Sequence, residues 1–304
     1  MMADITANAG RVVPASGNTR VAHRAAADEP IWVRRSLIGL VFVFLGVFLV
    51  VPLAIVLSSA LSQGWALYAR AVTDPDTWSA IVLTLWVVAI TVPLNTLFGI
   101  AAAWAIARFD FRGRSVLTSL IDLPFSVSPV VVGLAYVLVF GRGGWLGPWL
   151  GAHDIQIIFA MPGMVLVTMF VTVPFVAREL IPVLAERGQE EEEGALSLGA
   201  SGWQTFFRVT LPAVKWGLLY GVVLTTARAL GEYGAVAVVS GRVPGENETL
   251  TLRVDMLYEN YQATAAFAVA SLLAVIALIT LVLKTYLGDR KDNACPLSAG
   301  APDS

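Results

Sequence analysis

Two charged residues, Arg228 and Glu232, lie four positions apart in an otherwise apolar stretch of the chain. Residues at this spacing share one face of an α-helix, so the two side chains are placed to form an ion pair. A charge near the centre of a membrane-spanning helix costs roughly 2.5–3.5 kcal/mol on insertion scales, so it requires a partner or a water-filled cavity. Two interpretations are open. Either the pair fixes helix packing, or it lines a path in which Arg228 offers positive potential to a passing anion.

The stretch DLPFSVSPVVVG, residues 122–133, combines two prolines with Ser126 and Ser128. Each proline removes a backbone N–H and leaves a carbonyl without its helical partner. The stretch is therefore either a packing kink or a broken helix that lines the path of a solute. Both interpretations are open, and the kink is the simpler one.

Patterns for catalysis or metal binding are weak. His23 and His153 are far apart and have no Cys or His neighbours at ligand spacing, so we expect ordinary surface histidines and no metal site. The one cysteine, Cys295, cannot form an internal disulfide. Residues 194–201 read G-x-x-x-x-G-A-S, but Ala200 replaces the lysine of the phosphate-binding pattern and no strand precedes it. We expect no nucleotide or other cofactor to be bound by this chain.

The composition is that of a membrane protein. Hydrophobic residues make up 57% and charged residues 14% of 304 residues, with a mean hydropathy of +0.74. Soluble domains carry about 25% charged residues, and a net charge of −2 gives no indication of a nucleic-acid partner. A helix of about 20 apolar residues crosses the bilayer core. We predict an all-α integral membrane protein with six transmembrane helices, at about residues 36–61, 79–107, 116–140, 155–182, 213–240 and 263–287.

The basic residues indicate the orientation of these spans. Fifteen Lys and Arg residues lie in segments on one side of the membrane. The opposite side holds only Arg70, Arg142, Arg242 and Arg253. Because cytoplasmic loops carry the excess of positive charge, we predict that both termini are cytoplasmic. The predicted parts are a disordered tail at residues 1–35, the membrane domain at 36–287 with a cytoplasmic loop at 183–212, and a tail at 288–304.

One polar segment of that loop, EEEEGALSLGASGWQTFFRVTLP, interrupts the apolar pattern. It reads as two short helices around a hinge. Its four glutamates complement the N–H groups at the start of the first helix, Gly199 accepts a positive φ, and Ser201 caps the second helix. Trp203, Phe206 and Phe207 are three and four positions apart, which predicts one shared face. Because acidic residues disfavour an anionic lipid surface, we expect a protein partner with basic residues.

This segment resembles the cytoplasmic loop of ABC-importer permeases, which has the pattern E-A-A-x3-G-x9-[IV]-x-L-P. The matching positions are Glu193, Gly194, Ala195, Gly199, Val209, Leu211 and Pro212. Gly194 replaces the usual alanine, which we expect to loosen the first helix. The resemblance implies a type I ABC-importer permease fold (MetI-like) with a coupling helix between spans 4 and 5. In that family the loop docks into a cleft of the ATP-binding subunit and transmits its closure to the membrane helices.

Longer stretches, including PLNTLFGIAAAWAIARFDFRGR and FVARELIPVL, resemble sulfate/thiosulfate permeases, and GASGWQTFFRVTLPAVKWGLLYGVV most resembles their W-type subunit. The resemblance implies a non-enzymatic transport subunit of the bacterial inner membrane that forms the path with a T-type permease. Two ATP-binding subunits, which use the ATP, and a periplasmic sulfate-binding protein complete the assembly. ARALGEYGA is shared with molybdate permeases. A molybdate or tungstate permease is therefore an alternative, and a secondary anion transporter is another.

Overall fold

The computed structural model describes residues 31–293, in which all regular elements are helical. The chain separates into two units, residues 1–52 and residues 53–304. The N-terminal helical segment consists of α1 (Ile31–Leu45), the π-helical turn η1 (Gly46–Val50) and α2 (Val51–Leu61). These elements form one apolar helix of 31 residues. Because α1 begins at Ile31, the last five residues of the predicted disordered tail are helical; the rest of that tail lies outside the described residues.

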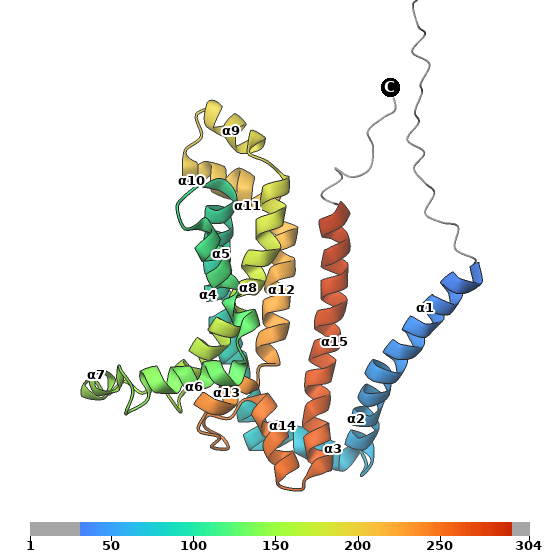
Figure 1. Cartoon of the computed structure of the whole chain (residues 1–304). Coiled ribbons are helices and arrows are strands. Elements are labelled where there is room, and N and C mark those ends of the chain that lie inside the picture. Colours follow the sequence, from blue (N-terminus) through green and yellow to red (C-terminus); the bar gives the residue numbers. More distant parts are fainter. Residues whose placement is uncertain (1–30, 294–304) are drawn as a thin grey trace, which may run out of the picture. The chain divides into compact units, whose positions relative to one another are not determined.

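The second unit is built around three long helices, α4 (Pro75–Arg108), α8 (Met161–Glu186) and α15 (Ala263–Asn293). Its shorter elements are α3 (Trp65–Thr73), α5 (Arg114–Ser126), α6 (Pro129–Phe140), α7 (Gly147–Ala152), α9 (Glu190–Ser197), α10 (Gly202–Thr205), the π-helical turn η2 (Phe206–Thr210), α11 (Leu211–Ala213), α12 (Lys215–Leu230), α13 (Gly234–Val239) and α14 (Leu250–Glu259). In Figure 1, α4, α8 and α12 run alongside one another, with α9 and α10 at one end and α3 and α14 at the other.

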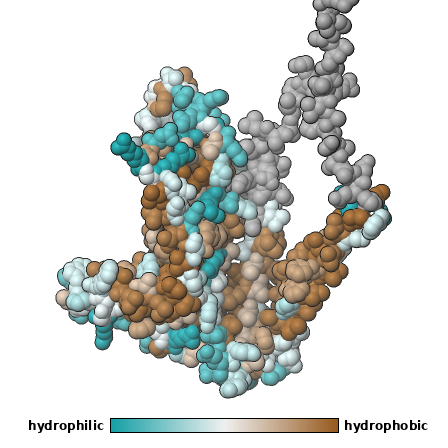
Figure 2. All heavy atoms as spheres, viewed as in Figure 1, coloured by the Kyte–Doolittle hydropathy of each residue, from teal (hydrophilic) through white to brown (hydrophobic). Residues whose placement is uncertain are grey.

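Four helices of the described chain are long and apolar enough to cross a membrane, and two bent helix pairs bring the number to six. The long helices cover residues 31–61, 75–108, 161–186 and 263–283. Figure 2 shows apolar surface along the middle of the second unit and polar groups gathered toward its ends. This distribution is expected where lipid replaces water around a helix bundle.

The stretch 122–133 contains a break rather than a kink. α5 ends at Ser126, α6 begins at Pro129, and their axes differ by 108°. Ser128 has an extended backbone (φ −61°, ψ 134°), as expected for a residue that precedes a proline. Pro129 occupies the first turn of α6, where a missing N–H leaves no helical hydrogen bond unmade.

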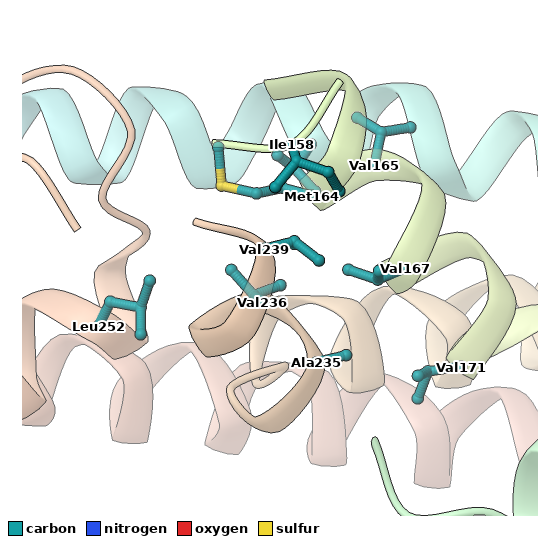
Figure 3. Close-up of a cluster of buried hydrophobic side chains, with 10 residues drawn as sticks. Ile158, Met164, Val165, Val167, Val171, Ala235, Val236, Val239 and Leu252 are labelled. Atoms are coloured by element: carbon teal, nitrogen blue, oxygen red, sulfur yellow. The ribbon is translucent and has the colours of Figure 1, made fainter. Parts of the chain in front are cut away.

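The fifth predicted span, 213–240, is also interrupted. α12 ends at Leu230, and α13 begins only at Gly234. Packing explains the interruption. A Cβ on Gly133 of α6 would lie 2.8 Å from the Ala235 carbonyl oxygen, so α13 approaches α6 at backbone distance. Figure 3 shows Val236 and Val239 of α13 in one buried cluster with Val167 of α8.

The centre of the unit is the packing of α4 against α8. Asn95 is fully buried between them and donates to the Met169 carbonyl at 3.0 Å and to the Thr172 hydroxyl at 2.7 Å. One turn further on, a Cβ on Gly99 would lie 2.6 Å from the Cβ of Val176. A polar bridge and a close backbone approach together hold the two spans in one register.

Candidate functional site

The polar segment folds into a helical hairpin at one end of the second unit (Figure 1). α9 carries four glutamates in its first turn, and Gly199 follows with φ of +87°. No neighbouring heavy atom lies within 4 Å of a Cβ built there, so glycine is required by the backbone conformation and not by crowding. The Ser201 hydroxyl accepts from the Gln204 N–H, and the Gln204 side chain accepts from the Ser201 N–H. The predicted positive φ and helix cap are both confirmed.

The outer surface of the hairpin is aromatic and apolar. Trp203 is 75% exposed and Leu198 92% exposed, and the ring of Trp203 stacks on that of Phe207 at 5.8 Å between centroids. Phe206 instead packs against Trp104 of α4, at 5.2 Å. The prediction that all three aromatic residues share one face is wrong for Phe206. Phe206 lies on the side of the hairpin that faces α4, whereas Trp203 and Phe207 lie on its exposed side.

The other residues of the loop pattern lie along the same hairpin. Glu193 and Gly194 are exposed, and a Cβ on Gly194 would meet only open space. Glycine is therefore not sterically required at this position, and α9 tolerates it despite its lower helix propensity. Leu211 and Pro212 begin the short turn α11, after which the chain bends by 71° into α12.

The most connected acid of the hairpin is Glu192, which the loop pattern does not include. Its Oε1 accepts from Arg108 Nε at 3.2 Å, from Arg108 Nη2 at 3.0 Å and from the Thr210 hydroxyl at 2.8 Å. Arg108 Nη1 also donates to the Leu184 carbonyl at 3.0 Å. Sequence reasoning missed this network because 84 residues separate Arg108 from Glu192, and no spacing along the chain indicates the contact.

The charged pair of the fifth span is formed, but not within a helix. Arg228 lies in the last turn of α12, and Glu232 lies in the turn beyond it. Their Nη1 and Oε2 atoms are 2.6 Å apart. The Glu232 side chain is 1% exposed, whereas 34% of the Arg228 side chain is exposed. The second carboxylate oxygen of Glu232 accepts from the Ala235 N–H at 2.9 Å, so it also caps the start of α13.

The break between α5 and α6, which follows Ser126 and contains Ser128, lies next to the turn that contains Glu232. A Cβ on Gly234 would lie 3.2 Å from the Cβ of Pro129, so α6 and α13 begin side by side. Ser126 and Ser128 are exposed. The structure thus brings the two interrupted spans together at this level, through the close approach of Gly234 to Pro129.

A second ion pair, also missed from the sequence, joins α5 to α8 on the other side of the break. Arg178 Nε donates to Asp122 at 2.7 Å, and the Arg178 guanidinium lies 4.8 Å from the centroid of the Phe125 ring. This contact combines a charge-assisted hydrogen bond with cation–π geometry. It ties α5, the helix that leads into the break, to α8.

A buried arginine cluster holds the opposite end of the unit together. Arg253 of α14 lies 2.7 Å from Asp74, 3.5 Å from Asp76 and 3.6 Å from Glu248. Glu248 is buried, and both of its carboxylate oxygens lack a hydrogen-bond partner. Burial raises the pKa of the Glu248 carboxyl above its usual range, although Arg253 favours the charged form. This cluster joins the start of α4 to α14.

The structure describes the side chains relevant to metal and nucleotide binding within residues 31–293. No group of three or more His, Cys, Asp or Glu side chains in this range is arranged around a metal position. Residues 194–201 lie on α9 and the turn after it, with no strand before them. His153 Nδ1 lies 2.8 Å from the Trp149 carbonyl, and the two rings are 4.6 Å apart. His23 and Cys295 lie outside the described residues.

Comparison with known proteins identifies the family. Residues 95–293 match the family described as "Binding-protein-dependent transport system inner membrane component". The chain belongs to this family. The permease is 56% identical over 255 residues to the "Sulfate transport system permease protein CysW" of Synechococcus elongatus, which covers 84% of this chain and 89% of the relative. The CysW protein of Escherichia coli K12 is 50% identical over 262 residues, or 86% of this chain and 90% of the relative.

Two further comparisons bear on the type of permease and on the fold. The "Sulfate transport system permease protein CysT" of Escherichia coli K12 is 34% identical over 244 residues, which cover 80% of this chain and 88% of the relative. The resemblance to the W-type sulfate permeases is confirmed. The fold is also similar to that of a chain in a bacterial alginate ABC transporter, solved in complex with its periplasmic protein. The superposition has a TM-score of 0.72 and 18% sequence identity, and it covers 85% of this permease and 94% of the transporter chain. The predicted ABC-importer permease fold is therefore confirmed.

Proposed function

We propose that the chain is the membrane-spanning W-type permease subunit of an ATP-driven importer of sulfate or thiosulfate. The observation that carries this proposal is 56% identity, over 84% of the chain, to a protein named as a sulfate permease. Identity to a protein named CysT is only 34%. This difference supports a heterodimer in which the present chain is the W-type subunit and a T-type permease supplies the other half of the path.

The hairpin is the proposed docking site for the ATP-binding subunits. Its exposed Leu198, Trp203 and Phe207 offer apolar anchors, and the exposed glutamates of α9 suit a partner with basic residues. The coupling residues are Glu193, Gly194, Ala195, Gly199, Trp203, Phe206, Phe207, Leu211 and Pro212. ATP is bound and hydrolysed by two partner subunits, and the permease supplies neither a catalytic group nor a cofactor site. Phe206, which packs on Trp104, supports the hairpin from inside.

The proposed anion path passes the level of the two helix breaks. Arg228, a third of whose side chain is exposed, supplies positive potential there. Ser126 and Ser128 at the neighbouring break supply hydroxyl donors. These groups are few for a dehydrated dianion, so the subunit provides a low-affinity route. Selection of the anion belongs to a periplasmic sulfate-binding protein.

The proposed location is the inner membrane of a bacterium, with both termini in the cytoplasm. The excess of Lys and Arg on one side supports this orientation. The hairpin lies at the same end of the bundle as the loop after α4, which contains Arg112 and is followed by Arg114 at the start of α5 (Figure 1). An ATP-binding partner therefore reaches the hairpin from the cytoplasm.

The test is uptake by a reconstituted complex. The permease, a T-type permease, the ATP-binding subunit and the binding protein are placed in liposomes, and uptake of labelled sulfate is followed with and without ATP. A complex with a catalytically inactive ATP-binding subunit is the control. We expect ATP-dependent uptake that excess unlabelled sulfate or thiosulfate inhibits. Inhibition by molybdate alone would identify a molybdate permease, and ATP-independent uptake would refute an ABC importer.

A further inference from the structure

Glycines flank the first helix of the hairpin, and its side chains are little buried. Gly188 and Gly199 have φ values of +65° and +87°, and a Cβ on either would meet open space. α9 contains no buried residue. Little apolar packing therefore fixes its position, and the flanking glycines leave the backbone free to pivot.

Glu192 is the side chain that fastens α9 to the membrane helices. Its side chain is 16% exposed, and that of its partner Arg108 is 9% exposed. Through Arg108, Glu192 is joined to the last residue of α4 and to the Leu184 carbonyl near the end of α8. Through the Thr210 hydroxyl it is joined to η2, the second half of the hairpin. One carboxylate oxygen thus connects both halves of the hairpin with two spans.

This network is not itself a ligand site. The cavity beside it, lined by Arg108, Glu192 and Thr210, has a volume of only about 10 Å³, which holds at most one water molecule. The donors of Arg108 are directed at protein acceptors in two different elements. Two guanidinium nitrogens of Arg108 donate to the same Glu192 oxygen, and both side chains are largely shielded from solvent. A charge-assisted contact of this kind has a more defined geometry than an exposed surface pair.

We propose that the network of Glu192, Arg108 and Thr210, here named the hairpin clamp, is the link that passes movement of the docked hairpin to α4 and α8. Because Asn95 and Gly99 hold α4 and α8 in one register, a pull on the clamp moves both spans together. Glu192 and Arg108 are therefore positioning residues for coupling, distinct from the exposed residues that meet the ATP-binding subunit. This inference rests on the proposed function.

The experiment uses the reconstituted complex with the clamp removed. Arg108→Ala combined with Glu192→Ala leaves no charge stranded, so it separates loss of the link from the cost of an unpaired buried charge. Glu192→Gln, which keeps an acceptor for Thr210, is the milder variant. Asp110→Asn is the matched control, because it breaks the exposed Arg114–Asp110 pair at the same end of the unit. Three quantities are measured: the amount of co-purified ATP-binding subunit, the basal rate of ATP hydrolysis, and the sulfate imported per ATP hydrolysed.

We expect the double variant to retain the ATP-binding subunit and basal hydrolysis while sulfate imported per ATP falls roughly fivefold or more, the range of a typical coupling between sites. Glu192→Gln should fall between this variant and Asp110→Asn, which should match the unaltered complex. An unchanged transport ratio in the double variant would overturn the clamp as a link. Loss of the ATP-binding subunit would overturn it too, because Glu192 would then act in docking. Absence of ATP-driven uptake by the unaltered complex would refute the proposed function itself.

Discussion

Replacement of Arg228 by methionine strands the carboxylate of Glu232 in the interior. That side chain is 1% exposed, and its Oε2 lies 2.6 Å from the Arg228 guanidinium. Removal of one partner of a buried ion pair costs about 3–5 kcal/mol, because the remaining charge is uncompensated. Total stabilities of domains are about 5–15 kcal/mol. We therefore expect Arg228→Met to reduce strongly the amount of assembled complex.

Glu232→Gln should be the milder of the two single changes. A glutamine side chain can still accept from the Ala235 N–H, so the cap of α13 is kept. Arg228 then lacks a counter-ion, but a third of its side chain is exposed, so it is less enclosed than Glu232. The cost of an uncompensated charge, about 3–5 kcal/mol for a buried pair, is largest for an enclosed group, so the more exposed Arg228 should cost less than the enclosed Glu232 carboxylate. The different burial of the two partners thus predicts that Arg228→Met is more destabilising than Glu232→Gln, which their spacing in the sequence does not predict.

The double variant, Arg228→Met with Glu232→Gln, distinguishes a role of the ion pair in helix packing from a role in anion transport. Both charges are gone and the cap is retained, so assembly should recover to near the unaltered level. If the pair only fixes packing, sulfate uptake recovers as well. We expect uptake to stay low, because a third of the Arg228 side chain is exposed and can meet a passing anion, whereas Glu232 is enclosed. Glu232→Gln alone should discriminate less sharply between anions than the unaltered complex, since its arginine is freed.

The assay measures assembly and uptake in the same samples. Co-purification with the other subunits and the midpoint of thermal unfolding report assembly, and initial rates of labelled sulfate uptake are divided by the amount of complex. Thr226→Val is the matched control, because it removes a hydroxyl from the same helix that donates only to the Val222 carbonyl. Full sulfate uptake by a well-assembled double variant would refute a role of Arg228 in passage.

Two further changes test other parts of the structure. Gly199→Val should leave the permease inserted but abolish coupled import, because a β-branched residue is strained at φ of +87°; Gly199→Asn should retain more import, and equal uptake by the two variants would contradict the argument. Glu248→Gln should flatten the pH dependence of stability. Because burial raises the folded-state pKa of Glu248, its contribution is complete below the unfolded pKa of about 4.3 and is lost as pH rises through the folded pKa. Thermal unfolding from pH 4.5 to 8, with the exposed Glu246→Gln as control, measures this, and unchanged slopes in Glu248→Gln would show the reasoning to be wrong.

Local structure was predictable wherever a single residue type decides the backbone. The positive φ of Gly199 and the cap at Ser201 follow from steric freedom and from a hydroxyl placed before a helix. The helical class followed in the same way from long apolar runs. Such features depend on neighbours in the sequence, so the sequence alone is enough to predict them.

Contacts between distant segments were not predictable. The interruption of the fifth span was not predicted, because α13 is held by α6 and α8, through the close approach at Gly133 and the cluster around Val236. In the sequence, Glu192 is indistinguishable from the three other glutamates of its run, and only its contact with Arg108 in the structure distinguishes it. Phe206 shows the same limit, because Trp104 decides which side of the hairpin it occupies. In each case the deciding partner lies in another helix.

The charges around the two breaks bear on how the proposed path would handle a dianion. Arg228 is paired with Glu232, and Arg178 is paired with Asp122, so a carboxylate partly offsets the positive potential of each arginine. A site with unopposed arginines would hold sulfate tightly, and tight binding slows release on the far side. Paired arginines still donate hydrogen bonds from their exposed edges, but at a smaller gain in free energy. Weak contacts of this kind suit a route through which the anion is driven by ATP and is selected before it enters. They also require that the second permease complete the donor set, because half of the surface around the passing anion would belong to it.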